Sequence, residues 1–219
     1  MKYFQNILGA MIFAIAMPWK GMPWKGISWE SLGGNMESTT KGQGFYQRMI
    51  RAARLDVGLY EEVEADRDAT FQAAMVVILS SVAAGIGSIT EGSIGFVLMS
   101  TVGALLSWCV WAFITYIIGA KMLPEPQTSA DYGELLRTIG FSSSPGIIRI
   151  LGIIPGLFGI VSLVASIWML VAMVIAVRQA LDYHSTFRAV GVCIIGWIVQ
   201  ALCIAFVLFG IAGMGMSDF

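Results

Sequence analysis

The chain after residue 70 consists of long hydrophobic blocks separated by short polar loops. A helix needs about 20 apolar residues to cross the hydrocarbon layer of a bilayer, and four blocks are long enough. They predict crossing helices over residues 71–90, 94–120, 157–177 and 187–210. A shorter apolar segment runs from Pro145 to Ile154 and ends at Pro155–Gly156, which breaks a helix. The pattern predicts an all-α membrane bundle of about five transmembrane helices, with amphipathic helices at the interface.

The composition agrees with a membrane location. Hydrophobic residues make up 57% of the chain and charged residues 12%, which is about half the charged share of a typical soluble domain. The net charge of -1 provides no basic field of the kind that attracts nucleic acid. The expected partners are therefore membrane lipids and other integral membrane proteins or further copies of this chain, and not nucleic acid.

The basic residues of the loops predict how the chain threads the membrane. Arginines precede the first crossing, and Lys121, Arg137, Arg178 and Arg188 lie in later loops. If all five segments cross, these cations fall on one side, which the positive-inside rule identifies as the cytoplasm. The sequence thus predicts a cytoplasmic N-terminal region and a C-terminus on the opposite side.

Residues 1–44 are expected to form a separate N-terminal part. The stretch Ile7–Ala16 is apolar, and its end resembles the cleavage site of a secretory signal. A cleaved signal would carry the following basic segment to the outside, against the predicted threading. An uncleaved segment is therefore preferred, which either lies in the interface or makes a sixth, thin crossing.

Residues 17–30, MPWKGMPWKGISWE, place tryptophans five residues apart and next to charges. Pro18 and Pro23 prevent a regular helix, whereas indole rings and lysines prefer the headgroup level of a membrane. This strap is expected to contact lipid or a partner through Trp19, Lys20, Trp24, Lys25 and Trp29. Two interpretations stay open: a recent duplication with incidental anchoring, or a docking strap for a neighbouring membrane protein, since tryptophan is enriched in interface hot spots.

Residues 45–70 are expected to form an amphipathic and acidic cytoplasmic segment, followed by a bundle over 71–215. A helix beginning near Phe45 would carry apolar residues on one side and arginines on another. Such a helix rests on an anionic leaflet, which predicts lipid contacts for Arg48, Arg51 and Arg54. The acidic run from Glu61 to Asp66 is expected to turn toward water or toward Arg67.

A second short amphipathic helix is predicted in the loop after the second crossing. It covers residues 129–139 and is opened by Thr128, with Asp131 in the spacing of a capping box.

Few polar side chains fall within the predicted crossings. Arg149 is an intramembrane charge, which is a functional hypothesis by default, although it lies close enough to Pro145 to reach the interface or pair with Glu134. Gln200 lies in the middle of the last crossing, where such residues usually bond between helices. Small residues that let helices approach recur four apart or nearly so, and predict packing seams at Gly103, Ser107, Gly119, Gly159, Ser162 and Ser166.

No catalytic, cofactor or metal site is predicted. The three cysteines lie in apolar runs without the spacing of metal ligands. His184 is the single histidine and could in principle ligate a haem or chlorin, but a structural role is preferred. No phosphate-binding loop, dinucleotide fingerprint or nucleophile elbow occurs.

The order of these segments resembles the Yip-domain family of integral membrane proteins, in a bacterial form. The resemblance runs from Phe45 to Gly210 and includes Asp56 and Tyr60 before the first crossing, the helix YGELLRTIGF, and Trp168. It also includes Pro145 and Pro155 around the short segment, and the turn VRQAL–STFRA. The resemblance implies five membrane helices, a cytoplasmic N-terminus and no catalytic residues. The DLYGP-type motif of eukaryotic members is absent, so their Rab-type GTPase partner is not carried over.

Three functions are compatible with this pattern. The leading hypothesis is a non-enzymatic scaffold or organising protein of the bacterial cytoplasmic membrane. A second is an accessory subunit of a larger respiratory or photosynthetic complex, docked through the strap. A third, of a different class, is a small-molecule transporter or channel that uses Arg149 and Gln200.

Overall fold

The computed structural model describes residues 44–88 and 94–215, and the regular structure of these residues is entirely helical. The apolar N-terminal segment and the strap lie outside the described residues, so their predictions are not tested. The elements are α2 (Phe45–Ala53), α3 (Val57–Ala65), α4 (Ala69–Gly87), α5 (Ile94–Tyr116), the π-helix η3 (Ile117–Met122), α6 (Tyr132–Phe141), the 3₁₀-helix η4 (Ser144–Ile153), α7 (Phe158–Ala180) and α8 (Thr186–Gly215). The predicted all-α class is confirmed.

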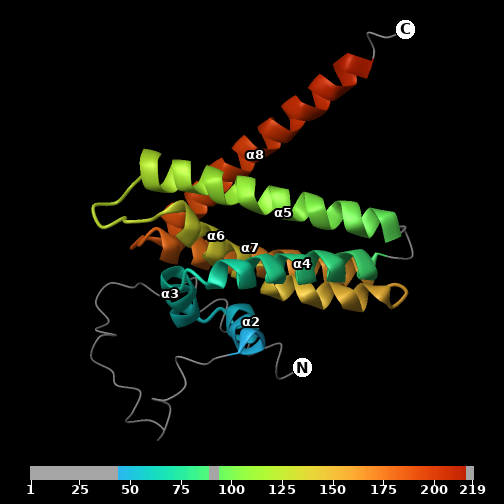
Figure 1. The fold of residues 1–219 in the computed structure, drawn as a ribbon, viewed down its shortest axis with the longest axis horizontal. Helices are drawn as coiled ribbons and strands as arrows, with labels where there is room; N and C mark the ends of the chain where they lie inside the picture. Colours follow the sequence, from blue (N-terminus) through green and yellow to red (C-terminus); the bar gives the residue numbers. More distant parts are fainter. Residues whose placement is uncertain (1–43, 89–93, 216–219) are drawn as a thin grey trace, which may run out of the picture.

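Four helices in the described part of the chain are long and apolar enough to cross a membrane. They cover Ala69–Gly87, Val97–Met122, Phe158–Ala180 and Thr186–Phe206. These ranges match the four long crossings predicted from the hydrophobic blocks. Figure 1 shows α4 and α5 side by side in opposite directions and α8 leaving the bundle obliquely, while α7 packs against η4, α6 and the start of α8.

The short third segment is η4, and it continues the path of α6 along α4. Three close backbone approaches mark this path. A Cβ added at Gly140 would lie 2.7 Å from the Ala73 Cβ, and one at Gly146 would lie 2.0 Å from the Ser80 Oγ. Further along α4, a Cβ at Gly87 would lie 2.0 Å from the carbonyl oxygen of Arg149. The α6–η4 run therefore follows α4 in the same direction, from its first turn to its last.

The combined length of α6 and η4 explains how a short apolar segment can make a full pass. Ten residues of α-helix span about 15 Å, and ten residues of 3₁₀-helix span about 20 Å because their rise per residue is larger. The sum exceeds the roughly 30 Å of a hydrocarbon core. The α6–η4 run is thus long enough for a full pass beside α4, because α6 supplies the length that residues 145–154 lack by themselves.

The amphipathic helix predicted at residues 129–139 is present as α6, but its start and its capping residue differ from the prediction. Helix α6 starts at Tyr132 and is capped by Asp131, whose carboxylate accepts a hydrogen bond from the Glu134 backbone N–H in a capping box. Thr128 instead donates its hydroxyl to the Leu181 carbonyl. Most of the helix is buried, because it packs between α4, α5, α3 and α7; the buried residues are Leu135, Arg137, Thr138, Ile139, Gly140 and Phe141.

Helices α2 and α3 pack against the bundle. Helix α3 contacts α6 and α7 and buries Leu59, Tyr60 and Val63 completely. Helix α2 lies against η4, and the Trp168 indole N–H of α7 donates to the Ala53 carbonyl over 2.8 Å. The segment before the first crossing is therefore part of the folded core.

Replacing Gly87 tests the contact between α4 and η4. Gly87→Ala would place a methyl group against the Arg149 carbonyl oxygen, a backbone atom that cannot move aside cheaply. Overpacking of this kind costs about 1–3 kcal/mol, so we expect the melting temperature in detergent to fall by roughly 3–10 °C. The matched control is Gly103→Ala, where nothing lies within 4 Å and alanine favours the helix. Equal melting temperatures for the two variants would contradict the packing described.

Candidate functional site

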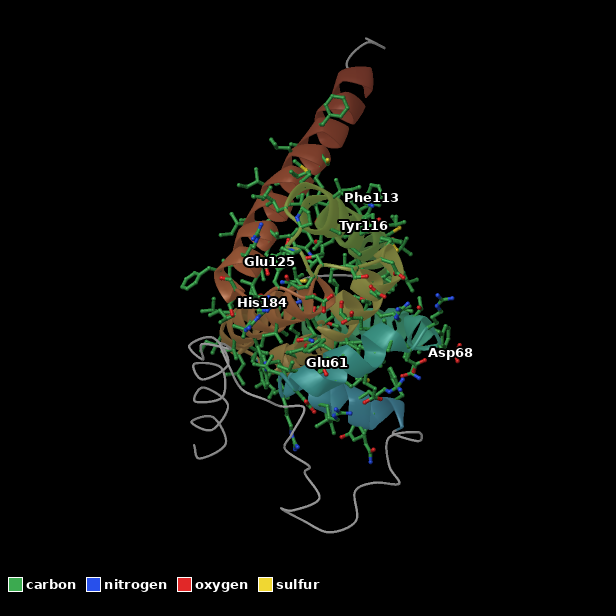
Figure 2. All side chains as sticks on the ribbon, turned by 90° about the vertical axis from the view of Figure 1, so that its left-hand side faces the viewer. Glu61, Asp68, Phe113, Tyr116, Glu125 and His184 are labelled. Atoms are coloured by element: carbon green, nitrogen blue, oxygen red, sulfur yellow. The ribbon has the colours of Figure 1, made fainter. Side chains whose placement is uncertain are left out.

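Polar and charged side chains gather at the end of the bundle where α3, the α5–α6 connection and the α7–α8 turn meet. Figure 2 looks onto this end, with Glu61, Asp68, Glu125 and His184 on the elements around it. The polar contacts here join segments far apart in the sequence, such as Gln179 of α7, which donates to Glu61 of α3 over 2.9 Å. This polar end is the largest concentration of titratable groups in the part of the chain that the structure describes.

Two arginines of α2, Arg48 and Arg51, form ion pairs with carboxylates of the same chain. Arg48 is only 9% exposed and forms ion pairs of 2.9 Å with both Glu62 and Asp66. Arg51 forms ion pairs of 2.7 Å with Asp56 and with Glu62. The expectation that the acidic run turns to water or to Arg67 is thus wrong for Glu62 and Asp66, because α3 folds back beside α2 and brings these carboxylates to the arginines.

The lipid contacts predicted for the three arginines stay a prediction. Arg54 is exposed and could meet a lipid headgroup directly. Arg48 and Arg51 are held in internal pairs, so an anionic lipid would have to compete with the carboxylates of α3 for them.

Arg137 of α6 closes the C-terminal end of α3. Its side chain is buried, and its guanidinium donates to the carbonyl oxygens of Val63 and Glu64 in the last turn of α3. These carbonyls have no partner within the helix and carry partial negative charge, so a cation is favourable there. The Trp108 indole of α5 similarly donates to the Leu136 carbonyl over 3.0 Å, which fixes α6 from the other side.

Two glutamates of α3, Glu61 and Glu64, have carboxyl groups whose pKa is raised by their surroundings. Burial, together with the charges of Asp182, Glu134 and Glu61, raises the pKa of Glu64 to about 8, and Arg137 offsets only part of this. Burial also raises the pKa of Glu61, while its hydrogen bond from Gln179 acts in the opposite direction. The pKa of Glu64 therefore lies near physiological pH in the folded protein, so the charge of this carboxyl is sensitive to pH there.

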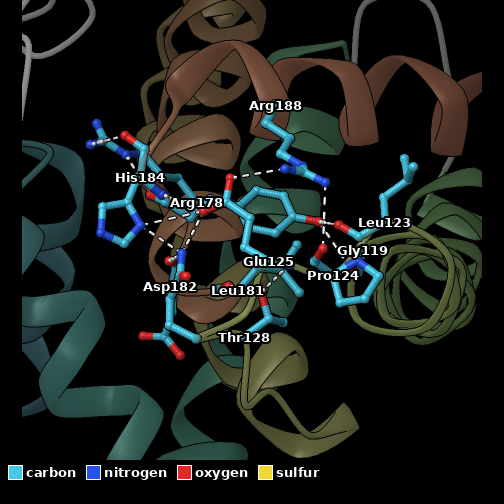
Figure 3. Close-up of polar contacts among 12 residues, drawn as sticks. Gly119, Leu123, Pro124, Glu125, Thr128, Arg178, Leu181, Asp182, His184 and Arg188 are labelled. Atoms are coloured by element: carbon cyan, nitrogen blue, oxygen red, sulfur yellow. Dashed lines mark hydrogen bonds and ion pairs between the residues drawn. The ribbon is translucent and has the colours of Figure 1, made fainter.

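The α5–α6 connection is clasped to the α7–α8 turn (Figure 3). The Tyr183 hydroxyl donates to the carbonyls of Gly119 and Leu123 at 2.9 and 2.7 Å. Arg188 pairs with Glu125 at 3.3 Å, and the His184 backbone N–H donates to the same carboxylate over 3.1 Å. Burial works against this carboxylate, but the hydrogen bonds from His184 and Gln127 and the charge of Arg188 lower the pKa of Glu125.

The geometry of this end is that of a structural clasp. The ring of His184 is 79% exposed, and its Nδ1 lies 2.6 Å from the Gln127 Nε2 and 3.4 Å from the Glu125 Oε2. Within the described residues, no group of three or more potential ligands could hold a metal ion. The alternative role of His184 as a haem or chlorin ligand stays a prediction.

Arg149 and Gln200 are not brought together. The Arg149 guanidinium donates to the Ser166 hydroxyl over 3.0 Å at the end of the bundle away from α3. Gln200 donates to Ser107 over 2.7 Å, joining α8 to α5. Glu134, the proposed ion-pair partner of Arg149, instead caps α6 at the polar end.

The predicted packing residues have different surroundings. Gly119 lies against Leu181, whose Cδ1 would be 2.3 Å from an added Cβ. Gly103 and Gly159 have nothing within 4 Å in the described chain, so any role in packing would involve another molecule. Ser162 faces a cavity that also contains Arg149, and this arrangement was not foreseen.

Sequence reasoning missed the residues that organise the polar end. Arg137, Tyr183 and Glu125 were treated as loop residues or not considered, because their partners lie more than 50 residues away along the chain. The spacing of Asp131 and Glu134 did carry a usable signal, since it is that of a capping box.

Glu64→Gln tests the raised pKa. Between the ordinary value of 4.5 and about 8, the folded state binds a proton that the unfolded chain has released, so stability falls as pH rises through this window. Glutamine imitates the neutral form at every pH. We therefore expect the melting temperature of Glu64→Gln, relative to the natural protein, to rise progressively from pH 5 to pH 9. The exposed Asp68→Asn is the matched control, and a flat difference for Glu64→Gln would contradict the burial of its carboxyl.

Comparison with known proteins agrees with this arrangement. The family described as the Yip1 domain matches residues 59–214, more than two thirds of the chain, whereas the resemblance seen in the sequence began at Phe45. The match contains α3 and the passes from α4 to α8, including the clasp and the α6–η4 run. No curated protein and no solved structure matches the chain. The extent of the family match shows that this chain belongs to the Yip1 domain family of membrane proteins.

Proposed function

We propose that this protein is a non-enzymatic membrane scaffold that associates with another membrane protein, or a second copy, through the outer part of α8. One observation carries the proposal: the α8 arm, defined as residues 201–206 and the helix beyond, leaves the bundle obliquely (Figure 1). Earlier in α8, Ala189 and Val192 are fully buried, so the helix is anchored at its start.

The arm has apolar side chains on all its sides. Leu202 is 65% exposed and Ile204 is 51% exposed. Because residues two apart lie on opposite sides of a helix, apolar side chains are exposed on both of these sides. Phe206 is 82% exposed. A helix with an apolar surface all round is stable only in lipid or against other apolar helices, so the arm offers a free surface for a partner within the membrane.

The polar groups of the described residues support a scaffold over a transporter. At the polar end they join α3, α6, α7 and the loops to one another, and Gln200 and Arg149 bond at separate places. A transport path needs polar groups that converge on one route through the bilayer. These bonds connect the helices of the described part of the chain to one another, which suits a protein that holds other membrane proteins.

The strap provides a second contact in this proposal. Its tryptophans and lysines would hold the N-terminal region at the headgroup level. In the accessory-subunit version of the proposal, the strap is the docking element and α8 supports it. In the scaffold version, changes in the α8 arm release the partner; in the accessory-subunit version, deletion of the strap releases it.

We further propose that α2, α3 and the clasp face the cytoplasm of a bacterial cell, with the C-terminus outside. The distribution of cations supports this orientation, because Lys121, Arg137, Arg178 and Arg188 belong to the end where α3 lies.

Cysteine labelling tests the threading. In a variant without the natural cysteines, single cysteines replace Asp68, Ile154 or Ser185, which are exposed residues. With a membrane-impermeant maleimide on sealed right-side-out vesicles, we expect Ile154→Cys to react at once. Asp68→Cys and Ser185→Cys should react only after the vesicles are opened. Labelling of Ser185→Cys but not of Ile154→Cys in the sealed vesicles would show that α6–η4 does not cross, because α7 would then carry Ser185 to the outer side.

Alanine substitutions in the arm test the scaffold function. The triple variant Leu202→Ala, Ile204→Ala and Phe206→Ala removes apolar surface from the arm, and the matched control replaces the exposed α7 residues Leu163, Ile167 and Leu170 with alanine. In mild detergent, native electrophoresis of the natural protein should show a species larger than one chain. We expect the arm variant to lose at least about 90% of that species, which corresponds to more than 1.4 kcal/mol, and the control to keep it.

Two results would reject the arm as the contact. One is migration of the natural protein as a single chain without a companion. The other is equal loss in both triple variants. Deletion of residues 1–35 separates the two versions of the proposal, because it releases the companion only if the strap is the docking element.

A further inference from the structure

A cavity of about 370 Å³ lies at the end of the bundle opposite α3. Its wall comes from α4, α5, η4 and α7, and its polar side chains are Arg149 and four serines: Ser81, Ser88, Ser100 and Ser162. The volume falls at the lower end of the range of about 300–1,000 Å³ that is usual for ligand pockets. The cavity is therefore large enough for a small polar group and not only for a single water molecule.

The position of the cavity places it near a membrane surface. Its α4 residues lie 12 to 19 positions after the start of that helix at Ala69, which corresponds to roughly 18–29 Å along its axis. The hydrocarbon core is about 30 Å thick. The α7 residues that line the cavity, Phe158 and Ser162, are in the first turns of that helix. The cavity thus lies within the leaflet farther from α3 and extends to the headgroup boundary of that leaflet.

Arg149 supplies positive charge without a carboxylate partner in the described residues. Its one hydrogen bond there goes to the Ser166 hydroxyl, which itself donates to the Ser162 carbonyl over 2.8 Å. No acidic side chain is among the described residues that line the cavity. A guanidinium has five N–H donors, and a charge that is half-buried in an apolar bundle is costly unless an anion neutralises it.

The serines add hydroxyl groups around this charge. Ser81, Ser88 and Ser100 donate to carbonyls of their own helices at 2.9, 3.2 and 2.9 Å. Each hydroxyl can rotate to donate to a ligand instead. One guanidinium with several hydroxyls matches a phosphate group, which has several acceptor oxygens and binds arginine through two parallel hydrogen bonds.

We propose that this cavity binds a phosphate group, held by Arg149 and the surrounding serines, and that the phosphate belongs to a phospholipid headgroup or to a small soluble phosphate ester. This site is independent of the proposed scaffold function. It makes Arg149 a ligand-binding residue and gives the end of the bundle away from α3 a role of its own.

Native mass spectrometry of the full chain in detergent tests the proposal with three probes. Dioleoyl phosphatidylglycerol carries both phosphate and acyl chains, dioleoylglycerol lacks the phosphate, and glycerol 3-phosphate lacks the acyl chains. The variants are Arg149→Met, which removes the charge, and Ala104→Leu, which fills the cavity from α5 while keeping the arginine. Arg67→Met is the control, since it removes an exposed arginine before α4.

We expect phosphatidylglycerol to bind the natural protein more tightly than dioleoylglycerol. Arg149→Met and Ala104→Leu should each weaken this binding at least about tenfold, the equivalent of one charged hydrogen bond, and Arg67→Met should leave it unchanged. If glycerol 3-phosphate binds with the same dependence on Arg149, the source of the phosphate is soluble; if it does not bind, the source is the lipid. Unchanged binding of both phosphate probes in Ala104→Leu and Arg149→Met, or equal binding of dioleoylglycerol, would overturn the proposal.

Discussion

Close backbone contact between α4 and the α6–η4 run is the constraint on which the rest of the structure depends. Glycines at positions 87, 140 and 146 remove the side chains that would separate the two backbones. Because the contact follows α4 along its length, the third pass is parallel to the first, and α7 must return in the opposite direction. The same contact places Arg137 beside α3 and Arg149 beside the cavity at the other end.

The two ends of the bundle differ in whether their charged side chains are paired with one another. At the end near α3, arginines and carboxylates neutralise one another, and Arg137 and Tyr183 occupy carbonyl groups that end helices. Such pairs contribute little net stability, since desolvation offsets their attraction, but they fix which segments lie together. At the opposite end Arg149 stands with serines around a cavity. Ion pairs and hydrogen bonds thus connect the segments at one end, whereas at the other end a single charged residue lines a cavity.

The apolar surfaces divide in a similar way. The core is filled by α2, α3, α4, α6 and the parts of α5, α7 and α8 that lie toward the polar end. The outer surfaces of α5 and α7 carry the exposed apolar residues expected of helices that meet lipid, and Leu202, Ile204 and Phe206 of the α8 arm are also exposed. Membership of the Yip1 domain family covers this whole arrangement. The frame and its oblique arm are the basis of the proposed scaffold function, and the cavity at the other end is the basis of the proposed phosphate site.

The sequence by itself determined the all-α class, the four long crossings and the family, because lipid requires long apolar helices and this requirement is readable from hydrophobic blocks alone. It also placed Arg149 and Gln200 in the membrane, but without their partners. Only the tertiary structure decided that α6 extends η4 into a full pass, that Glu62 turns to Arg48 and Arg51, and that Arg149 lines a cavity. These contacts join residues distant in the chain, and they depend on how helices pack, which hydrophobic periodicity does not encode.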